Sequence, residues 1–298
     1  MILVTGGSGV MGARIVRGLI RRGARVRALV LPADPLNVRL GDVDCEIWEA
    51  DITDAASVAG ALDGVHTVYH LAAVILADDP SIFERVNVGG TRNVVNAAAA
   101  AGSEHFVYVS SASVTYPRRT PYAESKLAAE QIVLEQEQMR TTIVRPTLLY
   151  DVGGGIEFMM FLDYLRRFPV VPFIGPGTAL KRPVWVGDLV QGLVAIAGNE
   201  TAYGKMYNLS GPEAMPIAEM ARIMLEHHHV WRPFLHLPTP LCNAAATLLD
   251  AVMRRPPLTH SAIAGIIQDA DLDCSAARRD LGYRPLTFRD GLRRCFPS

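Results

Sequence analysis

The sequence is poor in the features that mark disulfide-stabilised, nucleic-acid-binding and membrane-spanning proteins. Its four cysteines show no CxxC spacing and are too few for a disulfide framework. Its 29 Lys and Arg residues nearly balance 30 Asp and Glu residues without a basic block, so a nucleic-acid surface is not indicated. No apolar run approaches the roughly 20 residues of a membrane helix. The opening MILVTGG is expected to be a core strand rather than a signal peptide, which predicts a cytoplasmic protein.

Strands and helices are predicted to alternate over the first half of the chain. Short apolar runs at 1–6 and 105–111 are typical of buried parallel strands. Stretches with an apolar stripe at helical spacing predict helices at 13–22, 87–102 and 122–138. Strands separated by such helices indicate an α/β fold, a Rossmann-type doubly wound parallel sheet.

The amino-acid composition changes near residue 151. The stretches DVGGG and RFPVVPFIGPG are rich in glycine and proline, unlike the regular first half. We expect residues 1–150 to form the Rossmann domain, with 183–210 returning to it. Most of 151–298 is expected to form a smaller substrate-binding lobe. Ligands of open α/β sheets bind at the carboxyl edge, so the lobe should lie there.

The loop TGGSGVMG has three glycines at every third position. Gly6 can adopt a positive φ, Gly9 lets backbone amides approach a phosphate, and Gly12 permits close packing of helix on strand. The loop lies between the first predicted strand and an amphipathic helix, whose amino end carries a partial positive charge. This setting predicts a dinucleotide-binding turn.

The stretch PYAESK places Tyr122 and Lys126 one helical turn apart on the same face. A phenol is a poor base at neutral pH, but a neighbouring ammonium stabilises the phenolate. Such a pair can move a proton while a nicotinamide moves a hydride. Ser111, at the end of the preceding predicted strand, is placed to bind a substrate oxygen.

The chain resembles the extended short-chain dehydrogenase/reductases of the NAD-dependent epimerase/dehydratase type. The resemblance rests on TGGSGVMG, ADITD, YHLAA, NVGGTRNVVNAA, FVYVSSASV, YAESK, RPTLLY and RPVWVGDLVQG, in that order, over about residues 1–210. Only ten residues separate Ser111 from Tyr122. This short crossing and the carboxyl-terminal tail also resemble atypical members related to an accessory subunit of respiratory complex I.

The resemblance implies roles for individual residues. The implied cofactor-binding positions are Gly6, Gly9, Val10, Met11, Gly12, Asp51, Ile52, Leu71, Ala72, Ala73, Tyr122, Lys126 and Pro146. The implied catalytic positions are Asn87, Ser111, Tyr122 and Lys126. Tyr122 would be the acid/base, Lys126 would bind the ribose and lower the tyrosine pKa, and Asn87 would brace the active-site strand. Substrate would be bound by Ser111. Lys181 and Arg182 stand where sugar-nucleotide relatives bind diphosphate with a basic side chain. The alternative for these two residues is a solvated pair in a loop.

NAD is the expected cofactor, and NADP is not excluded. Family members that use NAD often have an acidic residue where Val30 stands, and many NADP users have arginine where Leu31 stands. Neither residue type is present, and no clear clamp for a 2′-phosphate appears. No metal site is expected, because three consecutive histidines at 227–229 cannot all face one ion from a helix.

Three functions stay open, all with a small-molecule ligand. The expected one is an epimerase, dehydratase or reductase of a nucleotide sugar or similar hydroxylated molecule. The second is a dehydrogenase of an apolar alcohol or ketone, such as a hydroxysteroid, which the lipophilic segment GIEFMMFLDYL favours. The third is a cofactor-binding assembly factor without turnover. By analogy, a homodimer would form through helices spanning roughly 81–101 and 121–138.

Overall fold

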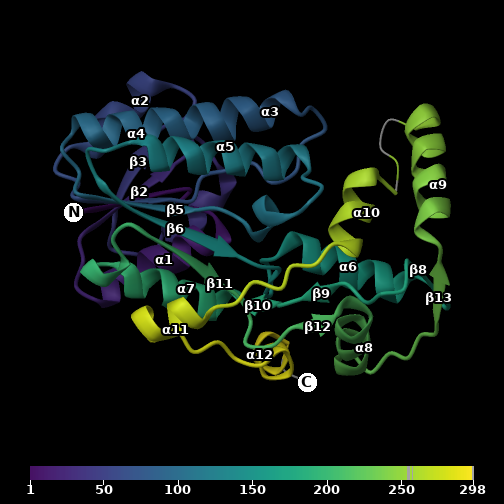
Figure 1. Ribbon diagram of the computed structural model, residues 1–298. Helices are drawn as coiled ribbons and strands as arrows, with labels where there is room; N and C mark the ends of the chain where they lie inside the picture. Colours follow the sequence, from purple (N-terminus) through teal and green to yellow (C-terminus); the bar gives the residue numbers. More distant parts are fainter. Residues whose placement is uncertain (254–255, 257, 297–298) are drawn as a thin grey trace.

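A seven-stranded parallel sheet forms the centre of the protein in the computed structural model, which describes residues 1–253, 256 and 258–296 (Figure 1). The strand order is β11-β6-β5-β4-β1-β2-β3, and neighbouring strands are parallel throughout. The strands are β1 (Ile2–Thr5), β2 (Val26–Val30), β3 (Glu46–Glu49), β4 (Thr67–His70), β5 (His105–Val109), β6 (Arg140–Pro146) and β11 (Lys205–Leu209). The prediction of a Rossmann-type doubly wound sheet is confirmed.

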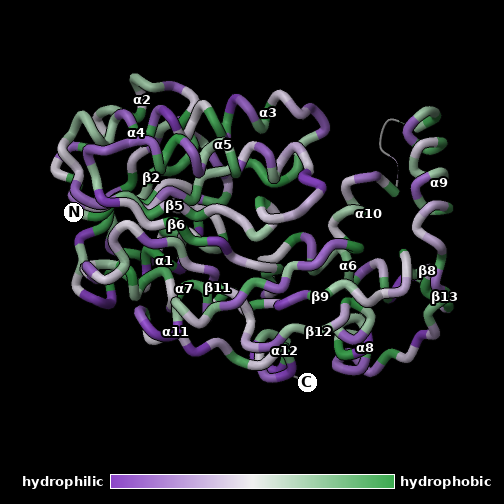
Figure 2. Tube along the Cα trace, in the orientation of Figure 1, coloured by the Kyte–Doolittle hydropathy of each residue, from purple (hydrophilic) through white to green (hydrophobic). Residues whose placement is uncertain are grey.

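Helices cover both faces of this sheet, and buried apolar side chains between the layers form its core. Hydrophobic stretches, green in Figure 2, occur both in the strands and in the covering helices. One face packs against α1 (Val10–Arg21), α7 (Val186–Ile196) and α11 (Ser275–Leu281). The other face packs against α2 (Ala55–Ala59), α4 (Gly90–Ala100) and α5 (Pro121–Glu135). The chain therefore returns to the sheet twice after residue 151, once with α7 and β11 and again with α11.

Two helices differ in detail from the sequence-based prediction. The first, predicted at 13–22, begins at Val10, directly after the glycine turn. The helix predicted at 87–102 is preceded by the short α3 (Ser81–Phe83) and a π-helical segment, η3 (Glu84–Gly89), before α4 begins. Wider π turns of this kind are frequent at functional sites. This segment contains Asn87, so the irregularity lies at a predicted site residue.

A second lobe lies beyond one end of the sheet (Figure 1). Its core contains the buried rings of Tyr150, Phe158 and Phe288. The lobe consists of β7 (Leu149–Tyr150), α6 (Ile156–Arg167), β8 (Val171–Ile174), β9 (Leu180–Lys181), β10 (Val184–Trp185), β12 (Met215–Pro216), α8 (Ile217–His227), β13 (Phe234–Leu237), α9 (Thr239–Val252), α10 (His260–Ile267) and α12 (Phe288–Cys295). Among the described residues, none of the helices combines the length and apolar character needed to span a bilayer.

An ion pair fastens α5, the helix that carries Tyr122 and Lys126, to the sheet. The carboxylate of Glu130 is only 2% exposed and accepts two hydrogen bonds, of 2.8 and 2.5 Å, from the guanidinium of Arg145 on β6. A pair with two parallel N–H···O bonds fixes orientation as well as distance. The position of α5 therefore depends on this contact.

We expect Glu130→Ala to lower the free energy of unfolding by about 3–5 kcal/mol, because it leaves the Arg145 charge without its partner. Urea denaturation at pH 7 measures the loss. Glu135→Ala, an exposed change on the same helix, should alter the free energy by less than about 0.5 kcal/mol. Equal effects of the two substitutions would contradict the assigned role of the ion pair.

Candidate active site

The glycine turn leaves an open space at the amino end of α1. Gly6 has φ +68°, and a Cβ atom added to Gly12 would lie 2.1 Å from the Gly6 carbonyl oxygen. A Cβ atom on Gly9 would meet only that same oxygen, at 3.2 Å. No side chain caps the helix, and its first turn has no acidic residue. The free amides of this turn fit the pyrophosphate of a dinucleotide.

The other predicted cofactor positions lie at the carboxyl ends of parallel strands. Val10 and Met11 begin α1 after β1, Asp51 and Ile52 follow β3, Leu71, Ala72 and Ala73 follow β4, and Pro146 ends β6. The amides of Leu71 and Ala72 donate to Thr5 Oγ1, at 3.1 and 3.2 Å. The sheet thus brings these positions to one edge, and their contacts with a cofactor stay a prediction.

Ser111, Tyr122 and Lys126 come together where β5 ends and α5 begins. The Lys126 ammonium donates to the Val109 carbonyl at 2.8 Å and lies 4.3 Å from the centre of the Tyr108 ring. Lys126 is 3% exposed, whereas Tyr122 is half-buried and keeps access to solvent. The phenol can therefore reach a ligand, and the lysine is enclosed behind it.

Burial dominates the electrostatics of this pair. It lowers the pKa of Lys126 to about 7, against a smaller opposing effect of Glu130. It also raises the pKa of Tyr122, helped by the charge of Glu157 and opposed by a hydrogen bond with Ser111. In the protein alone the phenol pKa is set by burial, Glu157 and Ser111, and the expected lowering by Lys126 stays a prediction. At neutral pH the phenol is protonated and can donate its proton.

Asn87 joins the loop after β4 to the catalytic helix. Its side chain accepts from the Val74 amide at 2.8 Å and donates to the Val74 carbonyl at 3.0 Å. It also donates to Ser125 Oγ at 2.9 Å, and that hydroxyl donates to the Tyr122 carbonyl at 2.7 Å. Asn87 thus positions α5 through Ser125 as well as a loop at the sheet edge.

One carboxylate that acts on the phenol was not among the residues predicted from the sequence. Glu157 lies in the first turn of α6 and is accessible to solvent, yet enclosure by the protein raises its pKa, against an opposing effect of Lys181. Its charge helps to raise the pKa of Tyr122 and, after burial, that of Tyr116 to about 12. Glu157 is therefore accessible to solvent and close enough to Tyr122 for its charge to act on the phenol. The available signal was an acidic residue two positions after the glycine run at 153–155.

Lys181 and Arg182 are engaged by the tail of the chain. The Lys181 ammonium donates to the carbonyls of Gly265 at 2.7 Å and Gln268 at 2.5 Å. Lys181 is 4% exposed, and burial lowers its pKa to about 8. Arg182 pairs with Asp271 at 2.5 Å. The alternative of a solvated loop pair is therefore wrong for Lys181, and the diphosphate-binding role stays a prediction.

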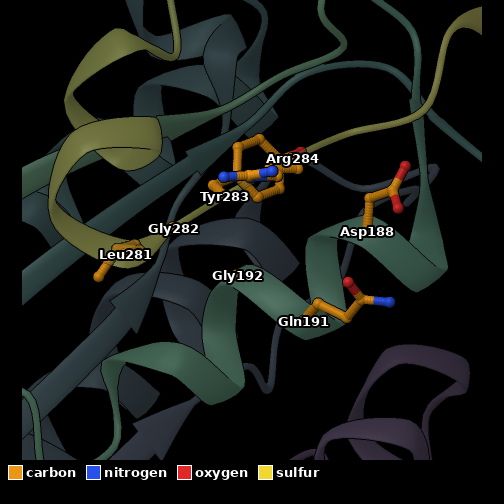
Figure 3. Close-up of a pocket in the computed structure, with 7 residues that line it drawn as sticks. All are labelled: Asp188, Gln191, Gly192, Leu281, Gly282, Tyr283 and Arg284. Carbon is orange, nitrogen blue, oxygen red and sulfur yellow. The ribbon is translucent and has the colours of Figure 1, made fainter.

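A small pocket also lies between α7 and residues 281–284 (Figure 3). Its lining includes Asp188, Gln191 and Tyr283. The Asp188 carboxylate accepts from the Leu286 amide at 2.8 Å, and the Tyr283 hydroxyl donates to the Ser210 carbonyl at 3.1 Å. These groups hold the tail against the sheet domain. None of the predicted site residues lines this pocket, so it is separate from the candidate active site.

Comparison with known proteins gives a consistent result over the whole chain. The family model described as "NAD dependent epimerase/dehydratase family" matches residues 2–210. The 3 beta-hydroxysteroid dehydrogenase/Delta 5→4-isomerase of Mycobacterium tuberculosis (strain ATCC 25618 / H37Rv) is 31% identical, over 99% of this chain and 89% of the relative.

Two solved structures share the fold. The crystal structure of gox2253 has a TM-score of 0.82 and 26% identity, covering 99% of this chain and 96% of that chain. The dTDP-glucose 4,6-dehydratase DesIV from Streptomyces venezuelae, solved with NAD and TYD bound, has a TM-score of 0.78 and 24% identity, covering 99% and 95%.

We expect Gly9→Val to abolish NAD binding while the protein stays folded. Its side chain would fill the space before α1 but meets little of the protein, so the unfolding free energy should fall by only about 1 kcal/mol. Calorimetric titration and denaturation measure the two effects. Gly12→Val should instead destabilise the fold itself by about 1–3 kcal/mol or more. Normal NAD affinity in Gly9→Val would reject the assignment of the turn.

The lowered pKa of Lys126 predicts how stability depends on pH. Between pH 7 and its ordinary pKa of 10.5, the unfolded chain binds a proton at this position that the folded chain lacks. The free energy of unfolding therefore gains up to about 1.4 kcal/mol per pH unit from this group as pH rises. Lys126→Met should remove that gain in urea denaturation between pH 7 and 9.5. An unchanged slope would contradict the pKa shift; the exposed Lys205→Met serves as control.

Proposed function

The chain belongs to the NAD-dependent epimerase/dehydratase family, and on that basis we propose that it interconverts an uncharged, apolar alcohol and its ketone. Family membership makes the protein an NAD-dependent hydride-transfer enzyme. The proposal concerns the substrate. It is the second of the functions that the sequence left open, and one observation favours it over a nucleotide sugar.

The chemistry follows from the three polar groups at the end of β5. NAD, when bound, accepts or returns the hydride of the reacting carbon. Tyr122 exchanges a proton with the substrate oxygen at its phenol oxygen, donating it in reduction and accepting it in oxidation. Ser111 holds the same oxygen by a hydrogen bond. Lys126, donating to Val109, keeps the first turn of α5 in place.

The cations that would bind a diphosphate are occupied by the protein itself. Two carbonyls at the end of α10 accept from Lys181, and Asp271 neutralises Arg182. A diphosphate would have to displace these contacts, and it would bring its negative charge towards Glu157. This commitment of Lys181 and Arg182 is the observation that carries the proposal of an uncharged substrate.

Two further observations support an apolar substrate. Three exposed apolar side chains lie next to site residues in the sequence. Ile75 and Leu76, which are 46% and 54% exposed, follow Val74, whose backbone is bound by Asn87. Ile156, which is 51% exposed, precedes Glu157. The relative from Mycobacterium tuberculosis, which covers nearly all of this chain, has a name that describes a hydroxysteroid as its substrate.

A substrate panel tests the proposal directly. We expect NADH to appear at 340 nm, in stoichiometric yield, when NAD is mixed with apolar secondary alcohols such as hydroxysteroids. Nucleotide sugars should give no product. Conversion of a nucleotide sugar with NAD returned unchanged would replace the proposal by the epimerase or dehydratase alternative.

We expect Tyr122→Phe to lower kcat by about 10²–10⁴-fold, the usual contribution of a general acid or base. Its dissociation constant for NAD should change by less than about twofold, because only the phenol oxygen is lost. Tyr203→Phe, in a tyrosine packed against His105, should keep the activity of the native protein. Full activity in Tyr122→Phe would remove the phenol from the mechanism.

Assembly and location are further proposals carried over from the sequence. The homodimer would use the α3–α4 region and α5, which lie side by side on one face of the sheet (Figure 1). The expected cytoplasmic location also stays a prediction. Gel filtration with light scattering tests the dimer.

A further inference from the structure

A chain of buried hydrogen bonds runs from the glycine turn towards the catalytic helix. Thr5 Oγ1, at the end of β1, lies 2.7 Å from His70 Nδ1, and His70 Nε2 lies 3.0 Å from Thr91 Oγ1 on α4. Thr91 Oγ1 in turn donates to the Asn87 carbonyl at 2.5 Å. These four residues are each at most 1% exposed. They connect β1, β4, α4 and the π-helical segment.

The direction of each hydrogen bond in this chain can be assigned. Thr5 Oγ1 already accepts from the amides of Leu71 and Ala72, which uses both of its lone pairs, so its proton goes to His70 Nδ1. Thr91 gives its proton to the Asn87 carbonyl, since two oxygens 2.5 Å apart need a proton between them. Thr91 must therefore accept from His70 Nε2–H.

The surroundings of His70 keep its ring neutral and fixed. Burial, with a smaller effect of the Lys126 charge, lowers its pKa to about 3. The ring stacks on Tyr108 with centroids 5.8 Å apart and is tilted against Phe106 at 5.9 Å. A neutral imidazole has one donor and one acceptor nitrogen, and both are used here. A charged ring, or the neutral form protonated at Nδ1, would place two donors or two acceptors against each other.

We propose that His70 is a positioning residue. In its neutral form, protonated at Nε2, it couples the cofactor-binding edge of the sheet to the catalytic phenol. At one end Thr5 holds the backbone of Leu71 and Ala72, which the resemblance assigns to the cofactor. At the other end Thr91 holds the turn that contains Asn87.

The side chain of Asn87 carries the connection onward. It binds Ser125 Oγ, which donates to the Tyr122 carbonyl. A shift of the residues after β4 is therefore transmitted to the first turn of α5, and a shift of α5 to the cofactor edge. Misplacement of a catalytic group by about 1 Å can cost about 100-fold in rate. The sequence analysis gave no function to His70 or Thr91.

Nitrogen NMR of the intact protein tests the assigned form of the ring. In uniformly ¹⁵N-labelled protein, long-range proton–nitrogen spectra distinguish the two neutral forms and the imidazolium. We expect His70 to be protonated at Nε2 alone from pH 5 to pH 8, with and without NAD. Protonation at Nδ1, or at both nitrogens, would overturn the proposal.

Substitutions at Thr91 test the coupling. Thr91→Val removes the hydroxyl, which is both the acceptor for His70 and the donor to Asn87. We expect a several-fold weaker affinity for NAD and a fall of about tenfold or more in kcat. Thr91→Ser keeps the hydroxyl and should restore both values to within about twofold. Loss of function in Thr91→Ser equal to that in Thr91→Val would show that the methyl group, not the hydrogen bond, matters.

Thr142 provides a matched control at the other end of the sheet. Its hydroxyl lies 2.8 Å from His105 Nε2 and donates to the Ala202 carbonyl at 2.7 Å, so Thr142→Val breaks a buried Thr–His contact of the same kind. It should cost similar stability but leave NAD affinity and kcat unchanged. Equal kinetic losses in Thr142→Val and Thr91→Val would show that the loss in Thr91→Val comes from general destabilisation. That outcome would overturn the proposal.

The proposal rests on the proposed function only for its kcat readout. If the substrate panel yields no turnover, the proposed function fails, while the NMR spectra and the NAD affinities of the Thr91 variants still test the coupling. If turnover is found and Thr91→Val keeps native NAD affinity and kcat, the coupling fails and the proposed function stands.

Discussion

The buried ammonium of Lys126 constrains the active site more strongly than any other group. Burying the Lys126 ammonium is costly, and one carbonyl acceptor and one aromatic face offset that cost. The helix α5 must therefore stay where Lys126 contacts the Val109 carbonyl and the Tyr108 ring. Tyr122 lies one turn earlier on the same helix, and Glu130, one turn later, is fixed to Arg145. Contacts of its neighbours along the helix therefore help to set the position of the phenol near the end of β5.

The first half of the fold could be predicted from the sequence, whereas for the lobe only its existence and its approximate place could be. Alternating buried strands and amphipathic helices repeat a local pattern, and parallel pairing then places every strand end, with Gly9 and Ser111, at one edge. The direction of Glu157 depends instead on a glycine run in which Gly155 has φ +71°. The burial of Lys181 depends on Gly265, 84 residues away. Such long-range contacts leave no periodic signal.

The spacing of Tyr122 and Lys126 did not indicate how strongly burial acts on the pKa values of the pair. Two groups one helical turn apart suggest a charge–charge effect, in which the ammonium stabilises the phenolate. That effect requires a charged lysine, and burial brings the pKa of Lys126 to about 7, so the lysine is about half neutral at pH 7. Burial and Glu157 meanwhile favour the neutral phenol. The protein alone thus holds Tyr122 as an acid, which suits reduction; oxidation needs higher pH or added positive charge beside the ring.

The charges of the lobe also support the proposal of an uncharged substrate. Lys181 donates to two backbone carbonyls at the end of α10, and Arg182 pairs with Asp271, so residues 265–271 engage both cations. Among the described residues no ion-pair partner offsets Glu157. An anionic ligand near Glu157 would meet the charge of this carboxylate, while Lys181 and Arg182 are already engaged by the tail. This distribution of charge supports the proposal of an uncharged substrate.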